Sequence, residues 1–176
     1  MRRVPEGWVS SAGVTAEGAA ESRQRAVSPE PAVEQSDMGA AELGALYWRE
    51  VERFMRGLVR ARTSRDGGVE LHLRPAGLTL IRLGPPELAA SADLVRCRYP
   101  IAGGLLARRA GGTISFSQET GPPVVLASAI AGFFPRFGAA PGRPRWTGAA
   151  YDLLQRRLHL AVSRRYFKTL LAGDRR

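Results

Sequence analysis

Hydrophobic residues recur every three or four positions between residues 40 and 62, in the segment AAELGALYWREVERFMRGLVRAR. That spacing gives a helix one hydrophobic face and leaves its charged residues on the others. Ser36 and Asp37 precede the segment, and either side chain is suited to capping a first helical turn. The pattern predicts an amphipathic helix over residues 40–62. Its hydrophobic face comprises Leu43, Tyr47, Val51, Phe54 and Leu58.

The hydrophobic period shortens to two after residue 68, which is typical of strands with one buried face. Every second residue is hydrophobic in VELHLR, and LTLIRL follows after a Pro-Ala-Gly turn. Residues 69–83 are therefore predicted to form a β-hairpin. The Gly-Pro-Pro sequence at residues 84–86 ends the hairpin, and residues 87–93 are predicted to be a loop or a single helical turn.

Three further strands are predicted between residues 94 and 131. In the first, hydrophobic Val95, Cys97 and Tyr99 alternate with Arg96 and Arg98, and TISFSQE has the same alternation. The run VVLASAIA has the length and branching of a buried strand, with a short buried helix as the alternative. The glycine pairs between the first two strands fit no phosphate-binding motif and indicate turns or bulges.

The longest helical pattern of the chain lies near its C-terminus, in TGAAYDLLQRRLHLAVSRRYFKTLL. Thr147 is placed to cap the helix and Gly173 to end it. Hydrophobic residues occupy two arcs of this helix, with basic residues between them. A helix this apolar is predicted to lie against the sheet, with the aliphatic stems of the basic residues covering apolar surface.

The fold class expected from these elements is α+β. We predict an antiparallel sheet of about five strands in meander order, flanked by an N-terminal helix and a long C-terminal helix packed on one face. Residues 39–176 are expected to form a single domain. Residues 1–38 contain few large hydrophobic residues and no sustained period, which predicts a disordered tail. Because the composition changes at Met38, translation starting at Met38 is an alternative explanation of this boundary.

The net charge of the protein indicates anionic partners. The 176 residues carry a net charge of +10, and Lys168 is the only lysine among 26 basic residues. Because a basic protein attracts anions, nucleic acid, anionic lipid and acidic small molecules are all candidate partners. The excess of arginine also fits a GC-rich coding sequence, so arginine content alone does not indicate phosphate recognition.

Cys97 is the only cysteine, which excludes an internal disulfide and a site of several thiolates. The two histidines lie 87 residues apart, without the spacing of metal ligands, so neither a metal nor a cofactor is predicted. The most apolar run, residues 124–134, is shorter than the roughly 20 residues of a membrane-spanning helix. We therefore expect a cytoplasmic protein.

A first functional hypothesis is a non-catalytic module that binds an amphiphilic or anionic small molecule between the sheet and the C-terminal helix. Arginine suits carboxylate and phosphate groups, and neighbouring apolar residues could hold a hydrocarbon or aromatic part. Solvated arginines over a filled core are the alternative. The predicted ligand-binding residues are Arg96, Arg98, Tyr99, Arg108 and Arg109.

A second hypothesis is that the C-terminal helix contacts nucleic acid or an anionic membrane surface. Residues 136–176 contain ten basic and two acidic residues, together with aromatic residues that could contribute to such contacts. The predicted contact residues are Arg157, Arg164, Arg165 and Lys168.

A third hypothesis is that the protein is an enzyme. Among the three hypotheses, this one has the least support from the sequence. Glu70 and His72 share one face of the predicted hairpin and could form an acid-base pair, with Glu119 as a further carboxylate. Solvent exposure is the usual position of such alternating polar residues, and no serine or cysteine lies in a nucleophile motif. His159 is expected on the polar side of the C-terminal helix.

Overall fold

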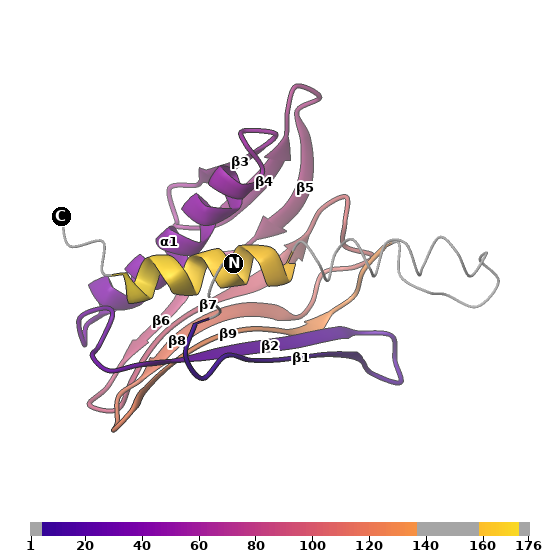
Figure 1. Cartoon of the computed structure of the whole chain (residues 1–176). Helices are drawn as coiled ribbons and strands as arrows, with labels where there is room; N and C mark the ends of the chain where they lie inside the picture. Colours follow the sequence, from indigo (N-terminus) through magenta and orange to yellow (C-terminus); the bar gives the residue numbers. More distant parts are fainter. Residues whose placement is uncertain (1–4, 137–158, 173–176) are drawn as a thin grey trace.

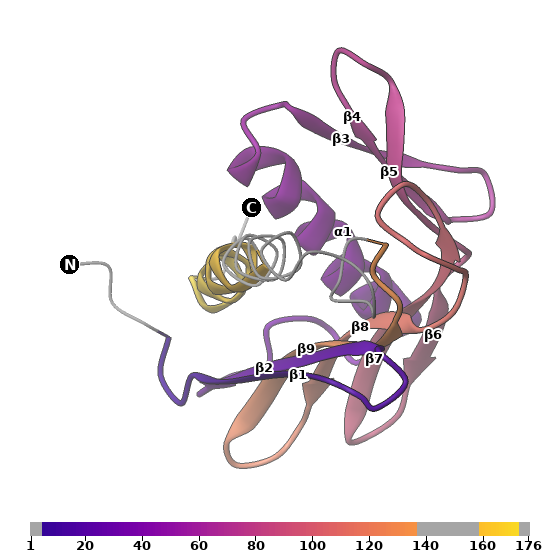
Figure 2. The ribbon, with the colours of Figure 1, turned by 90° about the vertical axis from the view of Figure 1, so that its right-hand side faces the viewer.

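A curved antiparallel sheet of nine strands forms most of the structure, with two helices against one face (Figures 1 and 2). The computed structural model describes residues 5–136 and 159–172, and these counts refer to those ranges. The helices are α1 (Asp37–Phe54) and a C-terminal helix that includes residues 159–171. The strands are β1 (Val9–Val14), β2 (Ala20–Ser28), β3 (Val59–Thr63), β4 (Val69–Leu73), β5 (Leu78–Leu83), β6 (Glu87–Ala90), β7 (Leu94–Gly103), β8 (Thr113–Glu119) and β9 (Val124–Phe133).

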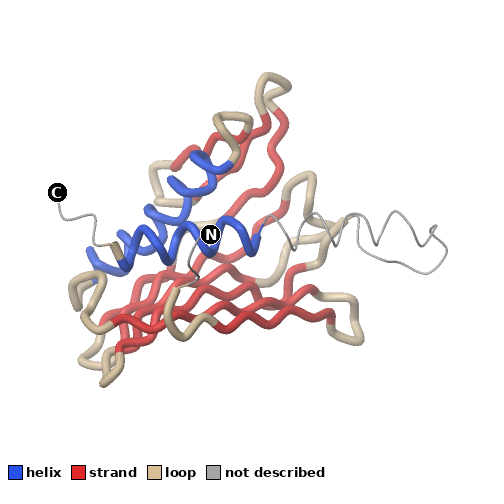
Figure 3. Tube along the Cα trace, viewed as in Figure 1, coloured by secondary structure: helices blue, strands red, loops and turns tan. Residues whose placement is uncertain are grey.

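The strand order is β1-β2-β9-β8-β7-β5-β4-β3, and β6 pairs with β7 beside this path. From β3 to β9 the chain follows the predicted meander. The N-terminal hairpin then joins the sheet beside its last strand, with Gln24 of β2 opposite Ser128 of β9. Residues about 100 positions apart in the sequence thus become neighbours on the inner face, which is the face that the helices cover (Figure 3).

The prediction of about five strands is wrong in number, because the described sheet has nine. The five predicted strands correspond to β4, β5, β7, β8 and β9. Of the four that were missed, β6 lies in the segment expected to be a loop or helical turn. It has four residues, and its exposed Leu88 gives no buried face that alternation could reveal.

The predicted disordered tail over residues 1–38 does not agree with the structure, which has β1 and β2 in this segment. All six residues of β1 are exposed, and the inward positions of β2 include Gln24 and Ser28. The alternation in β2 is therefore not one of hydrophobic and polar residues, so the usual signal of a strand is absent. A chain starting at Met38 would lack both strands.

Helix α1 begins at Asp37, and the predicted cap is confirmed, since the Ser36 hydroxyl accepts a 3.1 Å hydrogen bond from the backbone N–H of Gly39. The helix ends at Phe54, eight residues before the predicted end. Arg56 and Gly57 follow with φ of 49° and 80°, a left-handed conformation that breaks the helix and that glycine adopts readily. The remaining residues of the predicted helix start β3.

Aromatic residues of both helices and the sheet form the centre of the core. The ring of Tyr47 in α1 lies 4.5 Å from that of Phe116 in β8 and 5.4 Å from that of Tyr166 in the C-terminal helix. Tyr166 also lies 5.6 Å from Phe116. These contacts place both helices on the same face of the sheet, as predicted. The predicted cap of the C-terminal helix at Thr147 lies outside the described residues.

A buried glutamine of β8 fixes the connection between β2 and α1. The Oε1 atom of Gln118 accepts hydrogen bonds from the backbone N–H groups of Ala32 at 2.6 Å and Val33 at 3.1 Å. Its Nε2 group donates to the carbonyl oxygen of Val33 at 2.9 Å. Each hydrogen-bonding atom of this amide therefore has a partner, and the partners are backbone groups of the segment that precedes α1.

Candidate functional site

The predicted ligand-binding residues do not line one surface. Arg96 and Arg98 are exposed on the outer face of β7, whereas Tyr99 is buried on the inner face and stacks edge-on against Trp48 of α1. Successive side chains of a strand point to opposite faces, so these two arginines point away from the helices. Arg98 pairs with Glu87 of β6 at 3.6 Å. The space between the sheet and the C-terminal helix is thus not reached by Arg96 or Arg98.

Arg108 and Arg109 are exposed in the connection between β7 and β8. The guanidinium of Arg109 lies 3.7 Å from the centre of the Phe134 ring, a cation–π contact, and the backbone N–H of Arg108 donates to the carbonyl of Phe134. Both residues therefore hold this connection against the end of β9. Ligand binding by Arg96, Arg98, Tyr99, Arg108 and Arg109 remains a prediction.

Two of the basic residues predicted to contact anionic surfaces, Arg164 and Arg165, are exposed but contact other side chains of the protein. Arg165 lies 3.1 Å from Glu50, and Arg164 lies 5.7 Å above the ring of Trp8. Lys168 is half-buried, and Arg157 lies outside the described residues. The side chain of Glu50 is only 2% exposed and also pairs with Arg53 at 2.7 Å, so Arg165 helps to neutralise a buried carboxylate and joins the C-terminal helix to α1.

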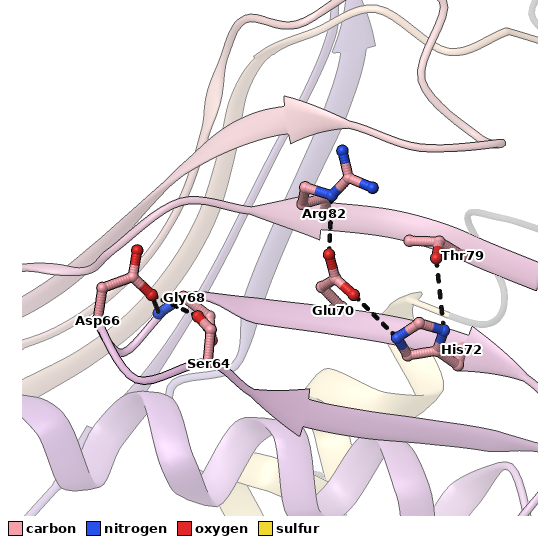
Figure 4. A network of polar contacts seen from close by, with 7 residues as sticks. All are labelled: Ser64, Asp66, Gly68, Glu70, His72, Thr79 and Arg82. Atoms are coloured by element: carbon pink, nitrogen blue, oxygen red, sulfur yellow. Dashed lines mark hydrogen bonds and ion pairs between the residues drawn. The ribbon is translucent and has the colours of Figure 1, made fainter.

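The Glu70–His72 pair exists, but on the outer face of the sheet (Figure 4). The Nε2 atom of His72 lies 3.0 Å from a Glu70 oxygen, and Arg82 donates to the other oxygen at 2.8 Å. Thr79 lies 3.4 Å from Nδ1 of His72. Arg82, and to a smaller extent His72, hold the pKa of Glu70 below its ordinary value, which favours an ionised Glu70 carboxylate over one that exchanges a proton. Glu119 lies on another strand, 3.9 Å from Arg23.

A different polar cluster lies inside, where β2, β9, α1 and the C-terminal helix meet. His159 is at its centre: its Nε2 atom is 2.9 Å from Oε1 of Gln24, and its Nδ1 atom is 3.1 Å from the hydroxyl of Tyr47. Ser128 donates to the same Gln24 oxygen at 3.1 Å. Because that oxygen can only accept, the Nε2 atom of His159 carries the proton and Tyr47 donates to Nδ1. We call Gln24, Tyr47, Ser128 and His159, with Ser22 and Ser163, the inner polar cluster.

Two atoms of the inner polar cluster, the Nε2 atom of Gln24 and the hydroxyl oxygen of Ser22, are buried without a hydrogen-bond partner in the described part of the chain. The buried hydroxyl of Ser163 interacts with the hydroxyl of Tyr47. Ser22 and Gln24 share the inward face of β2, and Ser163 follows His159 by one helical turn. The buried hydroxyl of Tyr166, the next inward residue of the same helix, also lacks a partner. Buried polar groups are normally paired, so this group of atoms is exceptional.

Burial keeps the cluster uncharged near neutral pH. It lowers the pKa of His159 to about 4 and raises the pKa of the Tyr47 and Tyr166 hydroxyls. His159 is therefore neutral and the two tyrosines are protonated. Among the cluster's residues none carries a charge under these conditions, so the arrangement offers hydrogen bonds rather than ion pairs.

An open groove of about 480 Å³ lies at the hairpin end of the cluster. It is formed by the last residues of β1, the start of β2 and the end of β9, and Ser22 is one of its lining residues. Ser22 thus belongs both to the groove and to the inner polar cluster. In the described ranges, no group of three or more side chains is arranged to hold a metal ion, and no helix is long and apolar enough to cross a membrane.

Sequence reasoning missed most of this cluster. Gln24 and Ser22 lie in the segment expected to be disordered, and Ser128 lies in a strand that was expected to be hydrophobic. His159 was expected on the polar side of its helix, yet it faces β2 and α1. A detectable signal was the alternation of uncharged Ser22, Gln24 and Ala26 with charged residues at positions 21, 23 and 25, which assigns the charged residues to one face of a strand.

Comparisons with known proteins add little to this geometry. No protein-family model matches the chain, and no curated protein matches it. Among solved structures, the chain is similar to the one titled "Crystal structure of Ara h 8.0201", with 13% sequence identity and a TM-score of 0.43. The alignment covers 86% of this chain and 100% of that one. A likeness of this size does not identify a function.

Proposed function

We propose that the protein binds a small, mostly apolar molecule with one uncharged polar group, such as a carbonyl or hydroxyl, between the inner face of the sheet and the C-terminal helix. Binding, rather than catalysis, is the proposed activity. The observation that carries this proposal is the pair of buried, unpartnered atoms contributed by Gln24 and Ser22. Each such group costs about 1–3 kcal/mol unless something hydrogen-bonds to it.

The chemistry of the cluster favours an uncharged ligand over an anion. The amide of Gln24 is a donor, and the serine hydroxyls donate and accept, which matches a carbonyl or hydroxyl group. Arg96 and Arg98, the residues expected to bind an anion, are on the outer face. A carboxylate at the cluster would lose its hydration without gaining a cation, and this cost opposes binding.

The surroundings fit the apolar part of such a ligand. Tyr47, Phe116 and Tyr166 pack beside the cluster, and Ile130 pairs with Ser22 across the strands. Small-molecule sites in proteins combine a mostly apolar lining with a few placed polar groups. The groove that Ser22 lines is open to solvent at this end of the sheet.

The test is a thermal-shift and native mass spectrometry screen with matched pairs of ligands. Each pair has one hydrocarbon chain that ends in an alcohol, a methyl ketone or a carboxylate. The alcohol and ketone should raise the Tm and bind at one per chain, and the carboxylate should not. The variant Gln24→Leu should bind at least tenfold more weakly, while the outer-face control Arg96→Gln should bind as the unaltered protein does.

Carboxylate binding that depends on Arg96 or Arg98 would overturn this proposal in favour of the anion-binding hypothesis. Absence of stabilisation by any member of the screen would also contradict it. Contact of the C-terminal helix with nucleic acid or anionic membranes stays a prediction. It is favoured less, because Arg164 and Arg165 already have partners within the fold.

A further inference from the structure

The two ends of the strand order differ in how they are protected. Strand β1 is at one end and β3 is at the other, and the short strand β6 is a further edge beside β7. The sequence of β1, VSSAGV, has no charged residue and no proline, and all six of its residues are exposed. Val9 and Val14 are 61% and 63% exposed, among the most exposed large hydrophobic residues in the described ranges. Natural proteins usually protect such edges, because unpaired backbone groups bind other strands.

The β3 edge has this protection. Its sequence, VRART, places the exposed side chains of Arg60 and Arg62 along the strand. The backbone N–H of Ala61 donates a 2.8 Å hydrogen bond to the carboxylate of Glu52 in α1, so an edge donor of β3 is already occupied. Charge and a side-chain cap therefore block strand addition at β3, and among the described residues β1 has neither.

The register identifies which backbone groups of β1 are free. Thr15 donates its N–H to Ala19 in the turn that joins β1 to β2. Antiparallel pairs alternate between hydrogen-bonded and non-hydrogen-bonded residues, and β1 pairs with β2 without a register shift. Val9, Ser11 and Gly13 therefore bond to β2. The N–H and C=O groups of the alternate residues, Ser10, Ala12 and Val14, point away from the sheet.

We infer that β1 pairs with β1 of a second copy of this chain, in antiparallel orientation about a two-fold axis at Ala12. In this register Ala12 lies opposite Ala12 of the second copy, and Ser10 lies opposite its Val14. Each of these is a hydrogen-bonded pair, so all the free edge groups of β1 gain a partner. The two sheets continue into one another with their inner faces on the same side.

The composition of β1 favours pairing with β1 of a second copy. The chain carries a net charge of +10, so most contacts between two copies bring like charges together. Because β1 has no charged residue, pairing of β1 with itself places no like charges directly opposite each other in the two strands. Its small side chains at Ser11, Ala12 and Gly13 leave the approach unobstructed, and pairing covers the exposed Val14.

Analytical ultracentrifugation of the full chain over a range of concentrations tests the inference, with Ala12→Pro as the key variant. Proline removes an N–H that points away from the sheet, so it should preserve the β1–β2 pair and the Tm. The unaltered protein and the control Ala12→Val should dimerise, and Ala12→Pro should be monomeric at every concentration. A monomeric unaltered protein, or a dimeric Ala12→Pro, would overturn the inference.

Amide hydrogen exchange gives a second readout that needs no variant. In the dimer, the amides of Ser10, Ala12 and Val14 should be protected, and dilution to the monomer should increase their exchange rates at least tenfold. The amides of Ser11 and Gly13, which bond to β2, should be protected at every concentration. Fast, concentration-independent exchange at Ala12 would contradict the pairing. Neither readout depends on the proposed ligand.

Discussion

Two glutamines on the inner face of the sheet, Gln118 and Gln24, are equally buried and differently paired. Both side chains have 0% exposure. Gln118 bonds to three backbone groups and leaves no hydrogen-bonding atom idle. Gln24 uses only its oxygen, for Ser128 and His159, and its amide nitrogen is unpartnered among the described residues. The difference indicates two roles: Gln118 holds the chain in place, and Gln24 has donor capacity left for a ligand.

The largest expected effect is a difference in the free energy of unfolding between substitutions of the two glutamines. Gln118→Leu leaves the N–H groups of Ala32 and Val33 and one carbonyl unpaired, at a cost of about 4 kcal/mol. Gln24→Leu leaves the Ser128 hydroxyl and the Nε2–H group of His159 unpaired but also removes an unpartnered amide, so its cost should be smaller, about 2 kcal/mol. Urea unfolding of both variants measures the difference. Equal losses of stability would refute the distinction.

The next effect is a dependence of stability on pH through His159. Burial lowers its pKa in the folded protein to about 4, below the ordinary value of 6.5. The unfolded chain therefore binds the proton first as pH falls. His159 contributes its full stability above about pH 6.5 and loses it towards pH 4, by roughly 3 kcal/mol in total.

Urea unfolding at pH 7, 5.5 and 4.5 measures this dependence. His159→Gln should flatten the curve between pH 6.5 and 4. The matched control is Arg96→Gln, which changes an exposed residue of the outer face, keeps both histidines and should leave the slope as it is. The assignment to His159 fails if both variants keep the same slope.

The sequence predicted the strands in which hydrophobic residues alternate regularly with polar or charged residues. Val95, Cys97 and Tyr99 alternate with two arginines, so β7 was predicted with its correct inner face. Strand β2 was not predicted, because two of its inward residues, Ser22 and Gln24, are polar. Strand β3 was assigned to the preceding helix, because its hydrophobic residues continue the helical period of α1.

The inner polar cluster was beyond sequence reasoning for a different reason. The contact between Gln24 and His159 joins residues 135 positions apart, and nothing local to either residue indicates the other. By contrast, the outward position of Arg96 and Arg98 follows from the same alternation that buries Cys97. Ligand binding at those arginines was predicted from residue type alone, and residue type does not determine the face.

The central claim, that the Gln24 amide binds a ligand, is tested most directly by side-chain amide resonances in a ¹H–¹⁵N correlation spectrum. Gln24→Leu and Gln118→Asn assign the two NH₂ groups by loss or displacement of a pair of signals. Addition of the alcohol or ketone that stabilises the protein should shift the Gln24 signals progressively to saturation, with the Gln118 signals unchanged. Unmoved Gln24 signals in the presence of saturating ligand would contradict the account.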